Sequence, residues 1–368
     1  MVKVLIVFGT RPEAIKMAPL VLECKKNEQI DCRVCVTAQH RSMLDQVLHN
    51  FGFEPDYDLD IMEKNQTLSG ITSKALIGIE KCIKDFEPDI VLVHGDTTTT
   101  LSGSLAAYYC QTKLGHVEAG LRTNNKYSPF PEELNRQLTG IIADYHFAPT
   151  EMAKENLLRE GKDENNIIVT GNTVIDALKT TVRDGYTHPV LDWASDSRMI
   201  LLTSHRRENL GEPMHNIFRA VSRIVEEFPD VKVVFPMHLN PKIKIYADEA
   251  LQKSDRIKII EPLEALDFHN FIARSHLILT DSGGIQEEAP SLGKPVLVLR
   301  DTTERPEGIE AGTLLLAGTE EERIYELTKQ LLTDDVMYKK MSETKNPYGD
   351  GLASQRIIKF IIERLTQQ

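Results

Sequence analysis

The sequence has little cysteine and little tryptophan: its 368 residues include five cysteines and one tryptophan. A sparse, odd set of cysteines in a chain of this length argues against a disulfide framework and favours a reducing compartment, so we expect a cytoplasmic protein. Cys32 and Cys35 form a CxxC pair, but they lie in an apolar run typical of a strand. Because residues three apart in a strand point to opposite faces, we expect no redox or metal site at this pair.

The chain also lacks a long apolar run and an excess of positive charge. No stretch approaches the roughly 20 apolar residues that span a bilayer, and the opening MVKVLIVFGTRPE is interrupted too early for a signal peptide. The formal net charge is −12, whereas duplex-binding proteins carry a basic face. We therefore expect neither a membrane nor a nucleic acid as partner. An anionic ligand would require cations gathered at one place.

Several motifs of nucleotide-dependent and metal-dependent enzymes are missing. Neither GxGxxG nor GxxxxGK[ST] occurs, which argues against a nicotinamide-binding Rossmann site and against a P-loop NTPase. No HExxH and no cysteine–histidine pair at zinc spacing occurs either, so a catalytic metal is not expected.

Short apolar runs alternate with helical stretches along the whole chain. This alternation is typical of βαβ units and predicts parallel sheets with helices on both sides. The predicted strands of the first half are Val2–Phe8, Cys32–Thr37, Ile90–His94, Lys113–Glu118, Tyr145–Ala148 and Ile167–Thr170. Those of the second half are Met199–Ser204, Val231–Pro236, Ile257–Ile260, His276–Thr280 and Pro295–Leu299.

The alternation breaks after Thr170, where Gly171-Asn172, a short predicted helix and the irregular stretch RDGYTHPVLDWASDSR follow. We therefore predict an α/β protein with two Rossmann-like, doubly wound domains and an interdomain cleft. The predicted domains are 1–171 and 172–351. A last helix at 352–368 has one apolar face and is expected to pack back on the first domain.

The strongest local signal is the tract Thr280–Glu307, TDSGGIQEEAPSLGKPVLVLRDTTERPE. Glycines after a buried strand let the backbone approach a ligand, and N–H groups at a helix start attract phosphate. A carboxylate one turn later can accept hydrogen bonds from a ribose diol, and arginines can neutralise a diphosphate. A plain βα turn is the alternative, but the whole tract favours a nucleotide diphosphate. The residues concerned are Ser282, Gly283, Gly284, Glu288, Arg300 and Arg305.

A second candidate phosphate contact lies in FGTRPEAIKMAPL, where Arg11 and Lys16 flank a predicted helix start. Arg11 could bind a phosphate with two parallel hydrogen bonds, although two solvated charges at a helix end are the alternative. In the second half, His205 and His238 each follow a predicted strand. A histidine there can titrate near neutral pH or bind phosphate, and metal binding is the alternative.

Three carboxylates stand where catalytic groups often stand. Asp96 and Glu118 follow or end predicted strands, and Glu132 lies at a loop-to-helix junction. Each could instead be a satisfied buried acid, and Asp96 could cap the helix that starts beside it. Three of them at one sheet edge favour acid–base chemistry.

Nine motifs taken in order make the chain resemble a known family. They are GTRPEAIKMAP, HGDTTTT, GHVEAGLRT, SPFPEE, TGNTVIDAL, SHRREN, HLNP, TDSGGIQEEAPSLGKPVLVLRDTTERPE and NPYGDG. Together they resemble the non-hydrolysing UDP-N-acetylglucosamine 2-epimerases, from the first strand to the last helix.

The resemblance implies a glycosyltransferase-B-like fold, a homodimer and the interconversion of UDP-GlcNAc and UDP-ManNAc for surface polysaccharides. It implies elimination of UDP to 2-acetamidoglucal and re-addition of UDP, with no cofactor and no metal. The catalytic candidates by position are Asp96, Glu118, Glu132 and His205. The positions implied to bind UDP or substrate are Arg11, Lys16, His238, Ser282, Gly283, Gly284, Glu288 and Arg305.

Some bacterial members bind a second UDP-GlcNAc as an activator. The matching positions include Gln39, Gln66, Arg206 and His238, whereas Ser42 replaces a usual glutamine and Asn65 a usual arginine. Three alternatives to the epimerase stay open: a glycosyltransferase of the same fold, a nucleotide-sugar sensor without catalysis, and a hydrolysing epimerase.

Overall fold

The computed structural model describes residues 1–38, 41–63, 66–237, 240–251 and 254–366. The chain forms two compact units. The first comprises Met1–Thr180 and Tyr348–Gln368, and the second comprises Thr181–Pro347.

The first unit is built on a parallel sheet of seven strands in the order β3-β2-β1-β4-β5-β6-β7. Its strands are β1 (Val2–Phe8), β2 (Ile30–Val36), β3 (Tyr57–Asp58), β4 (Ile90–His94), β5 (Lys113–Val117), β6 (Tyr145–Ala148) and β7 (Ile167–Val169). Its helices are α1 (Arg11–Lys26), α2 (Arg41–Phe51), α3 (Leu68–Phe86), α4 (Thr98–Tyr109), α5 (Glu132–Ile142), α6 (Glu151–Arg159), α7 (Thr173–Thr181) and α16 (Ala353–Thr366).

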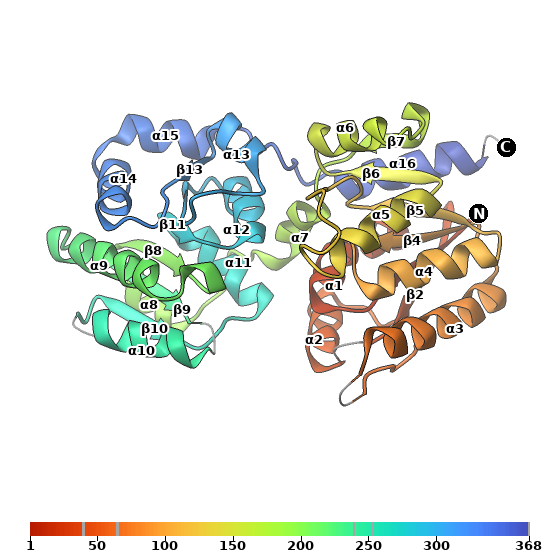
Figure 1. The fold of residues 1–368 in the computed structure, drawn as a ribbon, viewed down its shortest axis with the longest axis horizontal. Coiled ribbons are helices and arrows are strands. Elements are labelled where there is room, and N and C mark those ends of the chain that lie inside the picture. Colours follow the sequence, from red (N-terminus) through yellow and green to blue (C-terminus); the bar gives the residue numbers. More distant parts are fainter. Residues whose placement is uncertain (39–40, 64–65, 238–239, 252–253, 367–368) are drawn as a thin grey trace. The chain divides into compact units, whose positions relative to one another are not determined.

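Helices cover both faces of this sheet, which explains the continuous apolar run of β1. Val4, Ile6 and Phe8 pack with residues of α1, α2 and α16. Leu5 and Val7, which alternate with them, pack with residues of α3 and α4. Figure 1 shows α3 and α4 side by side on their face of the sheet.

The second unit repeats this plan with six parallel strands in the order β10-β9-β8-β11-β12-β13. Its strands are β8 (Arg198–Thr203), β9 (Val231–Pro236), β10 (Ile257–Ile260), β11 (Leu277–Thr280), β12 (Val296–Val298) and β13 (Leu314–Leu316). Its helices are α8 (Pro189–Ala194), α9 (Glu212–Glu227), α10 (Pro241–Ala250), α11 (Ala265–Arg274), α12 (Gly283–Glu288), α13 (Pro306–Ala311), α14 (Glu321–Thr333) and α15 (Asp335–Glu343).

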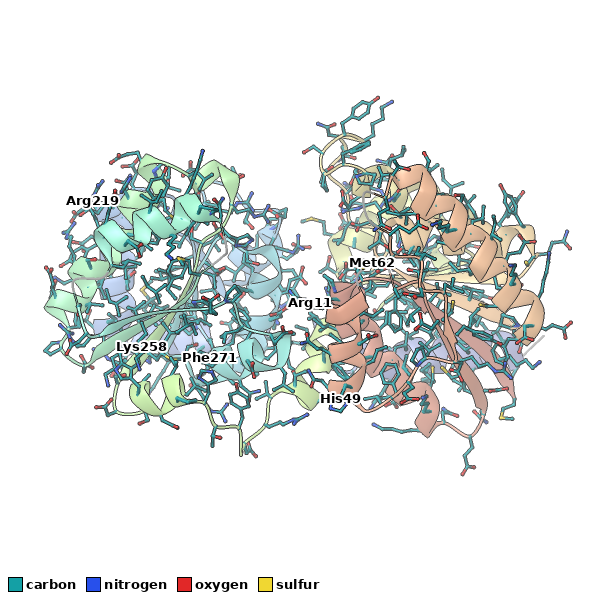
Figure 2. The ribbon with its side chains drawn as sticks, turned by 90° about the horizontal axis from the view of Figure 1, so that it is seen from below. Arg11, His49, Met62, Arg219, Lys258 and Phe271 are labelled. Carbon is teal, nitrogen blue, oxygen red and sulfur yellow. The ribbon has the colours of Figure 1, made fainter. Side chains whose placement is uncertain are left out.

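The core of the second unit is also divided by its sheet. Ile200 and Leu202 of β8 pack with α9, whereas Met199 and Leu201 pack on the opposite face, with Phe271 of α11. Phe271 is fully buried, and Arg219 of α9 lies at the outer surface (Figure 2). In each sheet the chain reverses its direction of winding beside the first strand, at β1/β4 and at β8/β11. Ligands of such sheets bind outside the carboxyl ends of the strands at these points.

The predicted fold class, two parallel-sheet α/β domains, is confirmed, and the cleft predicted between them stays a prediction. Two short edge strands, β3 and β13, were missed because two or three residues show no measurable period. The described part of the chain contains no helix long and apolar enough to cross a membrane.

The two units divide at 180/181 and 347/348, whereas the sequence placed the boundaries at 171/172 and 351/352. The difference arises because α7 packs with the start of α16. Asp176 of α7 accepts hydrogen bonds from the backbone N–H groups of Ala353 and Ser354 at 3.2 and 2.8 Å. Helix α16 contacts α1, and its apolar face enters the core of the first unit.

Candidate active site

Charged side chains gather at the carboxyl ends of β4 and β5 in the first unit. Asp96 follows β4 after Gly95, and Glu118 follows β5 directly. The two strands are neighbours, with His94 opposite Val117. Because parallel strands end at the same edge of the sheet, the two carboxylates come together there.

The Glu118 carboxylate is contacted from three other segments. Its Oε2 atom accepts hydrogen bonds from Lys16 Nζ of α1 and, at 2.9 Å, from Asn172 Nδ2. His94 Nε2 lies 3.7 Å from the same oxygen. Glu118 has a φ of 61°, in the left-handed region that non-glycine residues seldom adopt and that often marks functional sites.

The Asp96 carboxylate pairs with the Arg136 guanidinium of α5. Burial raises the pKa of Asp96, the Arg136 charge opposes this shift, and the nearby carboxylates of Glu118 and Glu132 raise the pKa further. The alternative that Asp96 caps α4 is wrong, since Thr97 is the N-cap residue and accepts a hydrogen bond from Thr100 N at 3.1 Å.

The negative charges of Glu118 and Glu132 both act on Asp96, so the three predicted carboxylates lie near one another. Glu132 is the first residue of α5, half-buried, and its charge acts on Asp96. Lys16 acts on Asp96 as well. The first unit therefore brings Asp96, Glu118, Glu132 and Lys16 together, with the additional cation Arg136. The arrangement supplies several acid–base groups beside two positive charges.

Glu13 is a buried carboxylate that the sequence reasoning overlooked. It accepts hydrogen bonds from Gly9 N, Thr10 N and Thr10 Oγ1 at 2.8 to 3.1 Å. It also accepts from Thr97 Oγ1 at 2.7 Å and Thr100 Oγ1 at 3.2 Å, and burial raises its pKa. Glu13 thus ties the loop after β1 to the start of α4. The T-x-x-E spacing of a helix capping box was its signal.

Arg11 is the first residue of α1 and half-buried (Figure 2). It follows the N-cap residue Thr10 directly, so it lies beside the loop that Glu13 organises. This position is compatible with the predicted phosphate contact at a helix start.

Three histidines of β4, β5 and β6 are buried. Burial lowers the pKa of His94 and His146 to about 4 and that of His116 to about 3. The imidazoles are therefore neutral near pH 7. His116 Nε2 lies 2.7 Å from the carbonyl oxygen of Gly95 and donates a hydrogen bond to it, which fixes the residue before Asp96.

In the second unit, Asp281 organises the carboxyl ends of β8 and β11. It is fully buried, and its Oδ2 atom accepts hydrogen bonds from Ser204 Oγ, His205 N, Arg206 N and Asn209 Nδ2 at 2.8 to 3.0 Å. His205 Nδ1 lies 3.1 Å from Asp281 Oδ1. Burial would raise the pKa of Asp281, but these hydrogen bonds outweigh burial and lower it. The sequence reasoning missed this carboxylate, which fixes His205 and Arg206.

Gly283 lies between two cationic side chains. A Cβ atom on Gly283 would lie 3.8 Å from Arg305 Nη2 and 3.9 Å from Arg206 Nη2. Arg206 also pairs with Glu304 at 3.1 Å, and Arg305 pairs with Glu287. Ser282 is the N-cap residue of α12. The atom nearest to such a Cβ would be Glu304 Oε1 at 3.4 Å, so a carboxylate lies beside Gly283 together with the two guanidinium groups. Guanidinium groups are suited to bind anionic groups.

Glu288 ends α12, which is short because a 3₁₀ turn containing Pro290 follows. A Cβ atom on Gly284 would lie 3.5 Å from Glu288 Oε1, so this carboxylate lies over the glycines. His269 Nε2 of α11 lies 3.6 Å from Glu288 Oε2. Arg300 pairs with Glu208 at 2.7 Å and also with Glu304, so it belongs to the same group of charges as Arg206.

Gln39 and His238 lie outside the described residues. Gln66 precedes α3, and its Oε1 atom lies 3.4 Å from Glu63 N. Within the described ranges, no group of three or more histidine, cysteine, aspartate or glutamate side chains could hold a metal ion.

The chain is similar to known proteins over nearly its whole length. The family model of UDP-N-acetylglucosamine 2-epimerases matches residues 22–362. The UDP-N-acetylglucosamine 2-epimerase of Bacillus subtilis is 69% identical over 360 residues, covering 98% of this chain and 95% of the relative. The epimerase of Escherichia coli is 52% identical over 371 residues, covering 98% of each.

Solved structures are similar over the whole chain. The S. aureus MnaA structure with UDP has a TM-score of 0.89 at 54% identity, covering 100% of this chain and 97% of that one. The UDP-GlcNAc 2-epimerase of Neisseria meningitidis bound to UDP-GlcNAc has a TM-score of 0.86 at 50% identity, covering 98% and 100%. The chain therefore belongs to the UDP-N-acetylglucosamine 2-epimerase family.

Proposed function

We propose that this protein is an isomerase that interconverts UDP-GlcNAc and UDP-ManNAc. The observation that carries the proposal is the group formed by Asp96, Glu118 and Glu132 with Lys16 and Arg136. Such a group can supply the acids and bases that epimerisation at a sugar carbon requires, and the family to which the chain belongs is named for this reaction.

The chemistry explains why several carboxylates are needed. The C2 atom of the sugar is not bonded to a carbonyl carbon, so its proton cannot be removed by simple enolisation. A base takes the C2 proton, the C1–O bond breaks, and UDP leaves with the bonding electron pair, which yields 2-acetamidoglucal. UDP then adds back to C1, and a proton returns to the opposite face of C2. This route uses no cofactor and no metal.

We assign Asp96 and Glu118 to proton transfer at C2, with Glu132 assisting and His205 as a further catalytic group. Burial raises the pKa of Asp96, which supports a carboxyl group that gives a proton more readily than an exposed aspartate does. His205 is supported by its fixed position on Asp281.

The UDP group must stay bound after its bond to the sugar breaks. The cations beside Gly283 and the loop after β1 support diphosphate binding, and Glu288 is suited to the ribose. The proposed contacts are Arg11, Lys16, His238, Ser282, Gly283, Gly284, Glu288 and Arg305.

The test is isotope exchange with UDP-GlcNAc as the only substrate. The protein is incubated in D₂O, and the products are examined by mass spectrometry and NMR. We expect UDP-ManNAc that carries deuterium at C2, together with deuterium in the recovered UDP-GlcNAc. No exchange without an added acceptor would contradict the proposal and favour a glycosyltransferase, and free ManNAc with UDP would favour a hydrolysing epimerase.

We also propose a homodimer. Supporting it, the neighbouring helices α4 and α5 present exposed apolar side chains: Tyr108, Leu134, Leu138 and Ile141. Contiguous exposed apolar groups often mark an interface. Light scattering of the wild type should give twice the chain mass of 41.6 kDa, and Leu138→Glu should shift it toward the monomer. A monomeric wild type would contradict the dimer.

We further propose that the protein is cytoplasmic, which its five free thiols support. We also propose that its UDP-ManNAc is used for surface polysaccharide, as the family resemblance implies. Regulation by a second UDP-GlcNAc at Gln39, Gln66 and Arg206 stays a prediction. A Hill coefficient near one, with no UDP-GlcNAc requirement in the reverse direction, would contradict it.

A further inference from the structure

Asn172 connects the proposed acid–base residue Glu118 to the end of the chain. Its side chain is buried, and its Nδ2 atom donates a hydrogen bond to Glu118 Oε2 at 2.9 Å. The Oδ1 atom of the same amide accepts from Val174 N at 3.1 Å. This second bond orients the amide, because its oxygen faces the start of α7 and its NH₂ group faces Glu118.

The backbone of Asn172 is held by the NPYGDG motif. Asn172 N donates a hydrogen bond to the carbonyl oxygen of Tyr348 at 2.7 Å. Tyr348 is itself buried. A segment that is more than 170 residues later in the chain therefore fixes the position of Asn172.

Two glycines make this contact close. Gly171 has a φ of +87°, and a Cβ atom on it would lie 3.0 Å from Gly349 Cα. A Cβ atom on Gly349 would lie 3.3 Å from Gly171 Cα and 3.4 Å from Asn172 N. A side chain at either position would push the two backbones apart by a few tenths of an ångström, and the positive φ values of both residues also favour glycine.

Charged groups join the same two segments on either side of the glycines. Arg356 donates to the carbonyl oxygen of Thr170 at 2.9 Å and pairs with Asp350 at 2.6 Å. Lys179 donates to the carbonyl oxygen of Gly351. Residues 348–351 are thereby fastened to residues 170–172 within the first unit.

We propose that Asn172 is a positioning residue for the acid–base chemistry of Glu118, and that residues 348–351 hold it in place. Asn172 donates a hydrogen bond to the same oxygen, Glu118 Oε2, that Lys16 also contacts, so this oxygen is held in place. The other oxygen, Oε1, faces Gly95. A hydrogen bond from Asn172 favours the ionised carboxylate, the form that accepts a proton. The inference rests on the proposed function of Glu118 and adds the supporting residues.

The test variant is Asn172→Asp, which keeps the shape and the acceptor for Val174 N but replaces the donor with a negative charge. The other charged or titratable groups that face Glu118 are Lys16, His94 and Asp96, and none of them changes. The added charge favours protonated Glu118. We expect kcat to fall at least about tenfold, with KM within about twofold. We also expect the acid side of the pH–rate profile to move upward by about one pH unit.

Asn27→Asp is the matched control. Asn27 makes the same type of bond, accepting from Gln29 N at 2.9 Å, on the surface after α1. It should keep wild-type kcat, KM and pH profile. An Asn172→Asp enzyme with the wild-type profile would overturn the proposal. So would one whose lower kcat came with a lower Tm and an unmoved pH profile, because that result indicates a structural role only.

A second pair of variants tests the glycine contact without changing a charge. Gly171→Ala adds a Cβ atom against Gly349, whereas Gly161→Ala has a similar φ of +76° but open space around it. We expect kcat to fall several-fold more for Gly171→Ala than for Gly161→Ala. Equal kcat values for the two variants would overturn the role of residues 348–351. If the wild type itself gives no UDP-ManNAc, the proposed function fails instead.

Discussion

Three carboxylates lie at the carboxyl ends of the strands in the two sheets, and each binds a residue that is far away in the sequence. Asp96 meets Arg136, 40 residues later. Glu118 meets Lys16, 102 residues earlier. Asp281 binds the backbone of His205, 76 residues earlier. In each case a buried or half-buried acid is matched by donors from another segment, as buried charges require.

Replacing Asp96 by asparagine tests the acid–base assignment. The amide can no longer exchange a proton with the sugar, so we expect kcat to fall by at least about 100-fold with little change in Tm. Steady-state kinetics and thermal unfolding measure both. The matched control is Asp144→Asn, at the opposite edge of the same sheet, where Asp144 accepts from Leu114 N at 2.7 Å. Unchanged turnover in Asp96→Asn would remove this residue from the mechanism.

Replacing Asp281 by asparagine tests the support of His205 and Arg206. A neutral amide oxygen accepts the four hydrogen bonds more weakly than a carboxylate oxygen, and the amide NH₂ group would replace the oxygen that faces His205 Nδ1. We expect a loss of roughly 2–4 kcal/mol in the free energy of unfolding and weaker UDP binding. Urea unfolding and calorimetry measure these quantities. Asp230→Asn, which removes an exposed ion pair with Arg198, should cost less than about 1 kcal/mol. Equal losses in the two variants would contradict the role of Asp281.

At the scale of elements, α16 completes the first unit although it is the last helix of the chain. Ile357, Ile358 and Ile361 are buried in the core that also contains β1 and α1. The spacing of these residues at i, i+1 and i+4 is that of one helical face, which the sequence already indicated. The spacing does not predict the surface against which this face of the helix packs.

Truncating one residue of this face should destabilise the first unit. Ile361→Ala leaves a cavity in a fully buried position, so we expect a loss of about 2–5 kcal/mol in the free energy of unfolding. Ile77→Ala, in an exposed position of α3 in the same unit, should change it by no more than about 0.5 kcal/mol. Urea denaturation followed by circular dichroism compares them. A loss below 1 kcal/mol for Ile361→Ala would mean that α16 adds little to the core.

At the scale of the whole molecule, the described histidines whose pKa is lowered by burial are distributed unevenly between the two units. His94, His116 and His146 lie in the first unit, and His276 lies in the second, where burial lowers its pKa to about 4. In the unfolded chain a histidine titrates near pH 6.5. Their contribution to stability is thus fully present above about pH 6.5 and is lost as pH falls toward about 4, because the unfolded chain then binds more protons.

The first unit should therefore lose more stability than the second on acidification. Each histidine adds a slope of up to about 1.4 kcal/mol per pH unit between about pH 6 and pH 4. Hydrogen exchange followed by mass spectrometry at pH 7 and pH 5, corrected for intrinsic exchange, should show a larger loss of protection in β4–β6 than in β8–β11.

His146→Gln removes one of these titrations and should reduce the loss of protection in the first unit. His49→Gln, at an exposed position of α2 (Figure 2), should leave it unchanged. Equal acid sensitivity of the two units would contradict the assignment of these histidines as buried neutral groups.

Much of this architecture was readable from local pattern. Largely apolar runs predicted β1, β4, β6, β9 and β10 with their observed bounds, because the strands of a parallel sheet are mostly covered by helices. The motifs predicted the family, and the positions of Asp96 and Glu118 after strands predicted that they share an edge. The domain boundaries fell elsewhere, since they depend on which unit α7 and residues 348–351 contact.

The sequence by itself determined most of the elements, the two-unit parallel-sheet plan and the family, because these are encoded in spacings of a few residues and in short motifs. The short elements β3, β13 and α8 were not predicted. Only the tertiary structure decided which partners surround each carboxylate. Arg136, Asn172 and Asp281 were not predicted because their roles depend on strand order and on contacts between distant segments. Glu13 had a local signal in its capping box, but its contact with α4 depends on the same packing. The local periodicity of a sequence predicts to which face of a helix or strand a side chain points. It does not predict which residue that side chain contacts, because the contact forms only when distant segments pack into one core.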